Sequence, residues 1–197
     1  MSINIYCLYG DYNVGKTYLA NKIVESHSSS FVRLSFAQKV KENFVKEIEP
    51  SLTLDDLNDR EIKEKYRSKI IDYAENIKTI EGEDVWAKLI INEIEEIHKT
   101  KNINNSIVTK CNFIIDDLRF VVEYETLNDF VYKHKAKLYL IHLISNNSYE
   151  DPQTSDLKTM IDKDRNRRLF EHYTFFNDYT DQTIKDIERE LYSLIQS

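Results

Sequence analysis

The chain has 197 residues, of which 41% are hydrophobic and 31% are charged, a composition that suits one domain with a core of its own. Its formal net charge of -7 argues against a general nucleic-acid binder, because contacts to phosphate backbones need an excess of lysine and arginine. Its apolar runs are far shorter than the ~20 residues of a membrane-spanning helix. We therefore expect a soluble, cytoplasmic protein without nucleic-acid or membrane partners, although locally clustered cations would still suit an anionic small molecule.

In chain order, apolar runs alternate with helical segments, and this order predicts a parallel sheet flanked by helices in one α/β domain over 1–197. The predicted strands are 3–9, 31–35, 112–116 and 137–143, with a weak fifth near 173–176. The predicted helices are 16–26, 37–48, 59–78, 84–99, 120–133 and 181–195, whereas 100–110 and 145–156 are predicted to be polar loops. Cys7 and Cys111 each lie in an apolar run, so we expect core residues and a reducing compartment.

The glycines are the most informative residues. The chain has only 3, against roughly fourteen expected from average usage, and Gly10 and Gly15 are two of them. They belong to the segment Gly10-Asp11-Tyr12-Asn13-Val14-Gly15-Lys16-Thr17, a complete G-x-x-x-x-G-K-[ST] pattern between a predicted strand and a predicted helix. This context predicts a phosphate-binding loop (P-loop), and the alternative is a simple turn before a helix.

The chemistry of such a loop assigns a role to each part. Phosphate oxygens require backbone N–H groups turned toward them, which glycine allows without a side chain in the way. Lys16 would reach the β- and γ-phosphates, the Thr17 hydroxyl would ligate Mg²⁺, and the positive end of the following helix would face the same charge. We therefore expect ATP and Mg²⁺ as cofactors. The expected nucleotide-binding residues of the loop are Gly10, Asn13, Val14, Gly15, Lys16 and Thr17.

A further series of residues follows the loop. It comprises Phe36-Ala37 with Lys41, then Arg67, then Trp86, and finally Asp117-Leu118-Arg119-Phe120 with Glu123. With the P-loop, this series resembles the deoxynucleoside monophosphate (dNMP) kinases of large DNA bacteriophages, over residues 1 to about 130. The resemblance implies a P-loop NTPase-type sheet, a helical acceptor-binding insert at 37–99, a lid at about 155–172, location in the host-cell cytoplasm, and a possible homodimer.

The resemblance also implies a reaction, the transfer of the ATP γ-phosphate to a dNMP to give a dNDP. Ala74-Glu75-Asn76 stands where the family usually has a glycine, and Val14 where it often has a serine, so the pattern is incomplete. Phosphomevalonate kinase, which has the same core, is similar across Lys63 to Glu75 and is the closest rival. A third possibility is a regulatory module that binds ATP without transferring phosphate.

The expected site residues divide by role. Asp117 would hold Mg²⁺ through waters or orient Arg119; Asp116 is the alternative, but the D-x-R spacing of the resemblance favours Asp117.

The basic stretch 163–168 is expected to be a closing lid, with a solvated helix face or a nucleic-acid or targeting patch as alternatives. Helix capping by Asp117, surface positions for Arg67 and Lys41, and core positions for Phe36 and Trp86 are the competing interpretations. The expected catalytic residues are Lys16, Asp117, Arg119, Arg165 and Arg168, with Arg167 on the nucleotide, and the expected acceptor-binding residues are Phe36, Lys41, Arg67, Trp86 and Arg119.

Overall fold

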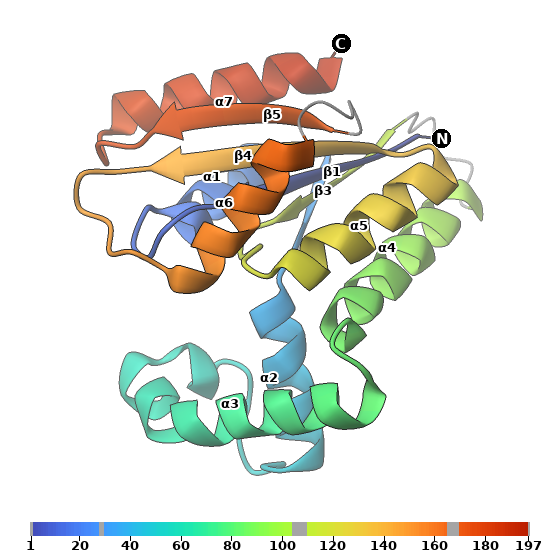
Figure 1. Ribbon diagram of the computed structural model, residues 1–197, viewed down its shortest axis with the longest axis vertical. Coiled ribbons are helices and arrows are strands. Elements are labelled where there is room, and N and C mark those ends of the chain that lie inside the picture. Colours follow the sequence, from blue (N-terminus) through green and yellow to red (C-terminus); the bar gives the residue numbers. More distant parts are fainter. Residues whose placement is uncertain (1, 28–29, 104–109, 165–169, 197) are drawn as a thin grey trace.

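The computed structural model, which describes residues 2–27, 30–103, 110–164 and 170–196, contains one parallel β-sheet (Figure 1). Its strand order is β2-β3-β1-β4-β5, and every neighbouring pair is parallel. The predicted parallel sheet flanked by helices is therefore confirmed, and the weakly predicted fifth strand lies at the edge. The strands are β1 (Ser2–Tyr9), β2 (Phe31–Leu34), β3 (Lys110–Ile115), β4 (Lys137–Ile144) and β5 (Glu171–Phe176).

The helices agree broadly with the sequence prediction, but the helix predicted at 59–78 runs to Glu81, the 3₁₀ helix at Asp56–Asn58 was not predicted, and two larger differences occur. The segment 145–156 was predicted to be a loop, but a helix begins at Pro152; the helix predicted to end at 99 continues to Ile103. Pro152 is the first residue of its helix and Asp151 precedes it, which is a helix-start signal that the polar composition obscured. The helices are α1 (Lys16–Ser26), α2 (Phe36–Glu47), the 3₁₀ helix η1 (Asp56–Asn58), α3 (Arg60–Glu81), α4 (Val85–Ile103), α5 (Val121–His134), α6 (Pro152–Asp164) and α7 (Asp181–Gln196).

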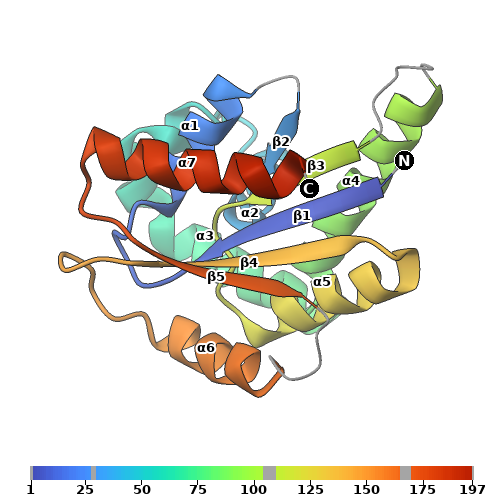
Figure 2. The same cartoon turned by 90° about the horizontal axis from the view of Figure 1, so that it is seen from above.

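Two apolar layers cover the sheet. Figure 2 shows α1 and α7 on one side and α5 and α6 on the other. The side chains of β1 alternate between these layers: Tyr6 packs with α1 and α7, whereas Ile5 and Cys7 pack with the layer that includes α2 to α6. Burial on both faces explains why the central strands are mostly apolar in sequence. Both cysteines are buried as expected, and Cys7 pairs with Ile115 while Cys111 pairs with Ile3, so they occupy different levels of the sheet.

The connections leaving the strands locate the functional edge. The connection after β1 leads to α1 on one face, whereas those after the neighbouring strands β3 and β4 lead to α5 and α6 on the other face. In open parallel sheets, ligands bind outside the carboxyl ends of the strands where connections diverge in this way. The segment 10–15 that follows β1 lies at that position.

The helical segment between β2 and β3 extends away from the sheet. In Figure 1, α2 leads down from the sheet, α3 runs across the bottom, and α4 returns toward the sheet. Aromatic contacts hold this arm together: the ring centroids of Phe44 and Tyr73 are 5.8 Å apart, and those of Tyr73 and Trp86 are 6.2 Å apart. Among the described helices, none combines the length and the apolar character needed to cross a membrane.

Candidate phosphate-binding site

The segment 10–17 forms a tight loop that leads into α1. Gly10 has φ 141°, and a Cβ built on it would lie 2.2 Å from the carbonyl oxygen of Leu143 in β4. No other residue fits this approach of two backbones, because the clash is with main-chain atoms and the conformation is strained for any L side chain. Asn13 (φ 63°) and Gly15 (φ 86°) are both left-handed, so the chain reverses its direction within a few residues.

Lys16 is held inside this loop. It is only 8% exposed, and its Nζ donates hydrogen bonds to the carbonyl oxygens of Gly10 (2.7 Å) and Asp11 (2.8 Å). Burial, followed by the positive charge of Arg119, lowers the pKa of Lys16 to about 8, although the carboxylates of Asp151, Asp11 and Asp117 oppose the shift. The amine is therefore partly desolvated, and a bound anion would favour its charged form.

The start of α1 has the same character. No side chain caps its N-terminus, and its first turn contains no acidic residue, so the positive end of the helix dipole is not neutralised locally. Thr17, in this first turn, is exposed. This terminus and the Lys16 amine therefore bring positive charge to the same end of β1.

The segment between β4 and α6 packs against the loop. Tyr12 and Tyr149 form an antiparallel bridge with N···O distances of 2.9 and 3.2 Å. Lys158 in α6 forms an ion pair of 3.1 Å with Asp11. These supports were not predicted from the sequence, because 145–156 was predicted to be a polar loop and α6 was not predicted.

Arg119 approaches the loop from the end of β3. Its guanidinium lies 5.3 Å from the ring centroid of Tyr12, and its Nε is 3.9 Å from Oδ2 of Asp151, which is fully buried. Within the described chain, neither Nε of Arg119 nor Oδ2 of Asp151 has a hydrogen-bond partner. Glu123 accepts hydrogen bonds from the backbone N–H groups of Arg119 (3.0 Å) and Phe120 (3.1 Å), which fixes the turn that carries the guanidinium. Burial raises the pKa of Glu123 to about 8.

The two adjacent aspartates have different environments. Asp117 accepts hydrogen bonds from the Ser35 hydroxyl (2.8 Å) and from the N–H groups of Phe36 (3.0 Å) and Ala37 (2.8 Å), so it fastens the start of α2 to the end of β3. Burial and the neighbouring carboxylate of Asp116 raise the pKa of Asp117. Asp116, only 1% exposed, pairs through Oδ2 with Arg33 at 2.9 Å, and its Oδ1 has no hydrogen-bond partner among the described residues. Asp117 therefore acts as a helix-capping residue, but it caps α2, which precedes it in sequence, and not α5, which follows it.

Of the expected acceptor residues, Arg119 lies beside the loop, and the other four have different environments. Phe36 and Trp86 are each 4% exposed and belong to the core. Lys41 is half-buried and donates to the Asn58 side chain at 3.2 Å, and burial together with the nearby cations lowers its pKa. Arg67 lies on the exposed surface of α3, with 60% of its side chain accessible, and pairs with Glu64 on the same helix at 2.8 Å.

Part of the expected site lies outside the described residues, namely Arg165, Arg167 and Arg168. Of the expected lid at 155–172, the described part consists mainly of α6, which is anchored by the buried side chains of Leu157 and Ile161. Over the described ranges, no group of three or more His, Cys, Asp or Glu side chains is arranged to hold a metal ion.

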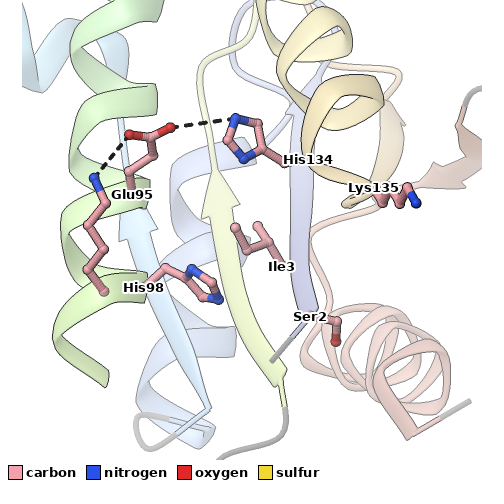
Figure 3. A pocket seen from close by; sticks show the side chains of 7 residues that line it. Ser2, Ile3, Glu95, His98, His134 and Lys135 are labelled. Atoms are coloured by element: carbon pink, nitrogen blue, oxygen red, sulfur yellow. Dashed lines mark hydrogen bonds and ion pairs between the residues drawn. The ribbon is translucent and has the colours of Figure 1, made fainter. Parts of the chain in front are cut away.

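A pocket at the opposite edge of the sheet is unrelated to this loop. It lies near the start of β1, between α4 and α5, where Glu95 pairs with His134 (3.6 Å) and Lys99 (3.4 Å) (Figure 3). Its volume of about 170 Å³ is below the ~300–1,000 Å³ of most small-molecule sites. The carboxyl edge of the sheet is therefore the stronger candidate. The pocket is lined by Ser2, Ile3, Glu95, His98, Lys99, His134 and Lys135.

Comparisons with known proteins give the following result. No protein-family model and no curated protein matches the sequence. Among solved structures, the chain is similar to a mutant APS kinase of Mycobacterium tuberculosis, with a TM-score of 0.46, 8% identity, and coverage of 100% of this chain and 98% of that chain. It is also similar to the shikimate kinase of Bacteroides thetaiotaomicron, with a TM-score of 0.45, 13% identity, and coverage of 99% of each chain.

Proposed function

We propose that this chain is an ATP-dependent phosphotransferase that transfers the γ-phosphate of ATP to the phosphate of a deoxynucleoside monophosphate. The observation that carries the transferase class is the meeting of two cations at the carboxyl ends of neighbouring strands. Lys16 follows β1 and Arg119 follows β3, and they are close enough for Arg119 to lower the pKa of Lys16. Two cations brought together in this way suit a polyphosphate, although Asp151 offsets part of their charge.

The proposed reaction is an in-line transfer. An oxygen of the acceptor phosphate bonds to the γ-phosphorus while the bond between that phosphorus and the β–γ bridging oxygen breaks, and ADP leaves with the electron pair. Positioning and charge neutralisation supply most of the rate in such a transfer. Lys16 would bind the β- and γ-phosphate oxygens, and Arg119 would stabilise the transferring group. Arg165 and Arg168 would act on the same group if the lid closes, and Arg167 would bind the nucleotide.

The backbone N–H groups of the loop would bind the phosphates, and Mg²⁺, when bound with ATP, would neutralise more of the phosphate charge. Thr17 and Asp117 are the residues proposed to hold it. Because Asp117 already accepts three hydrogen bonds, it would act through metal-bound water. Asp116 offers the better carboxylate oxygen, since its Oδ1 is buried and makes no hydrogen bond within the described part of the chain.

The choice of a dNMP as acceptor rests on the sequence resemblance, and α2 and α3 are the proposed acceptor lobe. Arg67 would have to leave Glu64 to grip the acceptor phosphate, which is energetically easy because exposed ion pairs contribute only ~0–1 kcal/mol. Lys41 would assist it. Phe36 and Trp86 are buried, so their part in acceptor binding would be to support the wall of the lobe and not to stack on a base.

A panel of acceptors tests this function. ADP release by the full chain with ATP and Mg²⁺ would be measured with each of the four dNMPs, with the matching ribonucleotides, with phosphomevalonate and with no acceptor. We expect stimulation by at least one dNMP. Stimulation by phosphomevalonate alone would assign the rival activity, and ATP binding without stimulation by any acceptor would make the chain a regulatory module.

The lowered pKa of Lys16 predicts a pH dependence. In the free protein, Lys16 loses its charge as the pH rises through about 8, so kcat/KM for ATP is expected to fall above that pH. Bound phosphates favour the charged amine, so the fall in kcat at saturating ATP should occur at higher pH. Initial rates from pH 6 to 10 at low and at saturating ATP would check this. A kcat/KM that stays level to pH 10 would contradict it.

Asp151 provides a related prediction. Its buried carboxylate raises the pKa of Lys16 and faces Arg119, so Asp151→Asn is expected to move the alkaline fall of kcat/KM to lower pH. Asparagine keeps an oxygen that can accept the hydrogen bond from the Gln153 N–H at 3.1 Å, so α6 should still form. The exposed Asp156→Asn on α6 is the matched control. The same pH profile in both variants would remove Asp151 from this role.

A further inference from the structure

The segment joining β5 to α7 lies against the phosphate-binding loop, and we call residues 177–180 the brace. Asn177, which is 1% exposed, donates a hydrogen bond from Nδ2 to the carbonyl oxygen of Val14 at 2.9 Å. The hydroxyl of Tyr179 donates to the carbonyl oxygen of Asn13. The two bonds join residues 163 and 166 positions apart in sequence, so they are a product of the fold and not of local turn geometry.

These two bonds fix the orientation of two successive peptide groups. The described chain contains no cis peptide bond, and in a trans peptide the C=O of one residue and the N–H of the next point in opposite directions. When the carbonyls of Asn13 and Val14 point toward the brace, the N–H groups of Val14 and Gly15 must point away from it. Neither N–H donates a hydrogen bond to any residue that the structure describes.

The brace is itself fixed. The N–H of Asn177 donates to the carbonyl oxygen of Ile144 at the end of β4 (2.8 Å), and its Oδ1 accepts from the N–H of Tyr179 (2.9 Å). Asp178 Oδ1 accepts from the N–H (3.0 Å) and the hydroxyl (2.8 Å) of Thr180, next to the start of α7. The bonds to the loop therefore come from a rigid support, which is what an orienting contact needs.

The brace also accounts for the second glycine of the loop. A Cβ built on Gly15 would lie 2.6 Å from Nδ2 of Asn177, so a side chain there would push away the amide that holds Val14. The left-handed φ of 86° disfavours a side chain independently. The requirement for glycine at this position thus has a tertiary cause as well as a local one.

We propose that Asn177 and Tyr179 are positioning residues that preset the N–H groups of Val14 and Gly15 toward the phosphates of a bound nucleoside triphosphate. The ligand of these groups is the polyphosphate chain, because two adjacent N–H donors in a loop with left-handed residues form an anion-binding concavity. The proposal rests on the ATP site of the proposed function, but it concerns binding of the triphosphate and not the acceptor. It makes no use of the acceptor lobe.

The test measures binding and catalysis separately. Tyr179→Phe removes the hydroxyl and keeps a ring that is 44% exposed, so the fold should be unchanged. We expect the Kd for ATP and for inorganic tripolyphosphate, measured by titration calorimetry, to rise about 3- to 10-fold, the usual value of one hydrogen bond. KM for ATP should rise equally with kcat unchanged, because binding is lost in the ground state and the transition state alike. The melting temperature without ligand should fall by no more than a few degrees, because the same single bond is lost from the free protein.

Two further variants complete the design. Asn177→Ala should weaken the binding of ATP and tripolyphosphate at least as much. The double variant should lose less binding free energy than the sum of the single variants, because both hydrogen bonds hold one short loop. Tyr132→Phe, on the exposed surface of α5, is the matched control.

The possible outcomes separate this proposal from the proposed function. Wild-type Kd values in Tyr179→Phe and Asn177→Ala, or a lower melting temperature with unchanged Kd, would overturn the brace and leave the transferase intact. Weakened ATP binding in a chain that phosphorylates no acceptor would support the brace and overturn the transferase. Failure of the wild type to bind ATP or tripolyphosphate would overturn both.

Discussion

Lys16→Met is expected to lower kcat/KM for ATP by two to four orders of magnitude. Removing one preorganised charge that stabilises a transferring phosphoryl group costs on the order of 3–5 kcal/mol. Methionine retains most of the length of the buried side chain, so the core around α1 should stay packed. The loss would appear in steady-state rates and, independently, in calorimetric titration with ATP.

The control for this variant is Lys22→Met, on the same helix. Lys22 lies on the exposed surface of α1 and pairs with Glu25 at 3.0 Å. Its loss should leave the kinetics within about twofold of the wild type, since an exposed pair of this kind contributes little. Wild-type rates in Lys16→Met would exclude Lys16 from the mechanism, whatever the control shows.

Gly10→Ala is expected to have the second large effect, a loss of about 3 kcal/mol or more in the free energy of unfolding. The added Cβ would lie 2.2 Å from the carbonyl oxygen of Leu143, so β1 and β4 would have to separate at their carboxyl ends. The loop that positions Lys16 would move with them, and activity should be lost even at temperatures where the variant is folded. Urea denaturation gives the stability, and ATP titration below the transition gives the binding.

Gly15→Ala makes the informative comparison. There the nearest atom is the side-chain Nδ2 of Asn177 at 2.6 Å, which can move, whereas the obstacle at Gly10 is backbone. We expect Gly15→Ala to lose less stability than Gly10→Ala but to weaken ATP binding strongly, because it displaces the amide that holds Val14. Equal stability of Gly10→Ala and the wild type would contradict the close approach of the two strands.

Asp116 and Asp117, at the end of β3, show most clearly what spacing along the chain leaves undetermined. The D-x-R spacing favoured Asp117 as the residue facing the metal, yet its carboxylate receives three hydrogen bonds at the start of α2, and Asp116 has the buried oxygen without a partner in the described chain. Spacing along the chain places both residues at the end of β3 but does not say which way each side chain turns. That direction depends on Arg33 and Ser35, more than eighty positions away in sequence.

The missed helix α6 shows a second limit. Its buried face is short, essentially Thr154, Leu157 and Ile161, and its surroundings in sequence are polar. Such a segment is stable as a helix because it packs against the sheet and α5, and not because of its own periodicity. Without α6, neither Asp151 nor Lys158 could be assigned to the loop.

What the sequence alone determined is the loop at 10–17, which it predicts to bind phosphate, and the order of the strands and most of the helices around it. Both follow from local causes: a contiguous pattern of glycines, lysine and threonine, and apolar runs long enough to be strands. The tertiary structure alone decided which distant side chains support that loop, among them Asp151, Asn177 and Tyr179. The physical reason is that parallel strands bring their carboxyl ends to one edge, where residues from well-separated segments form hydrogen bonds whose geometry no spacing in the chain encodes.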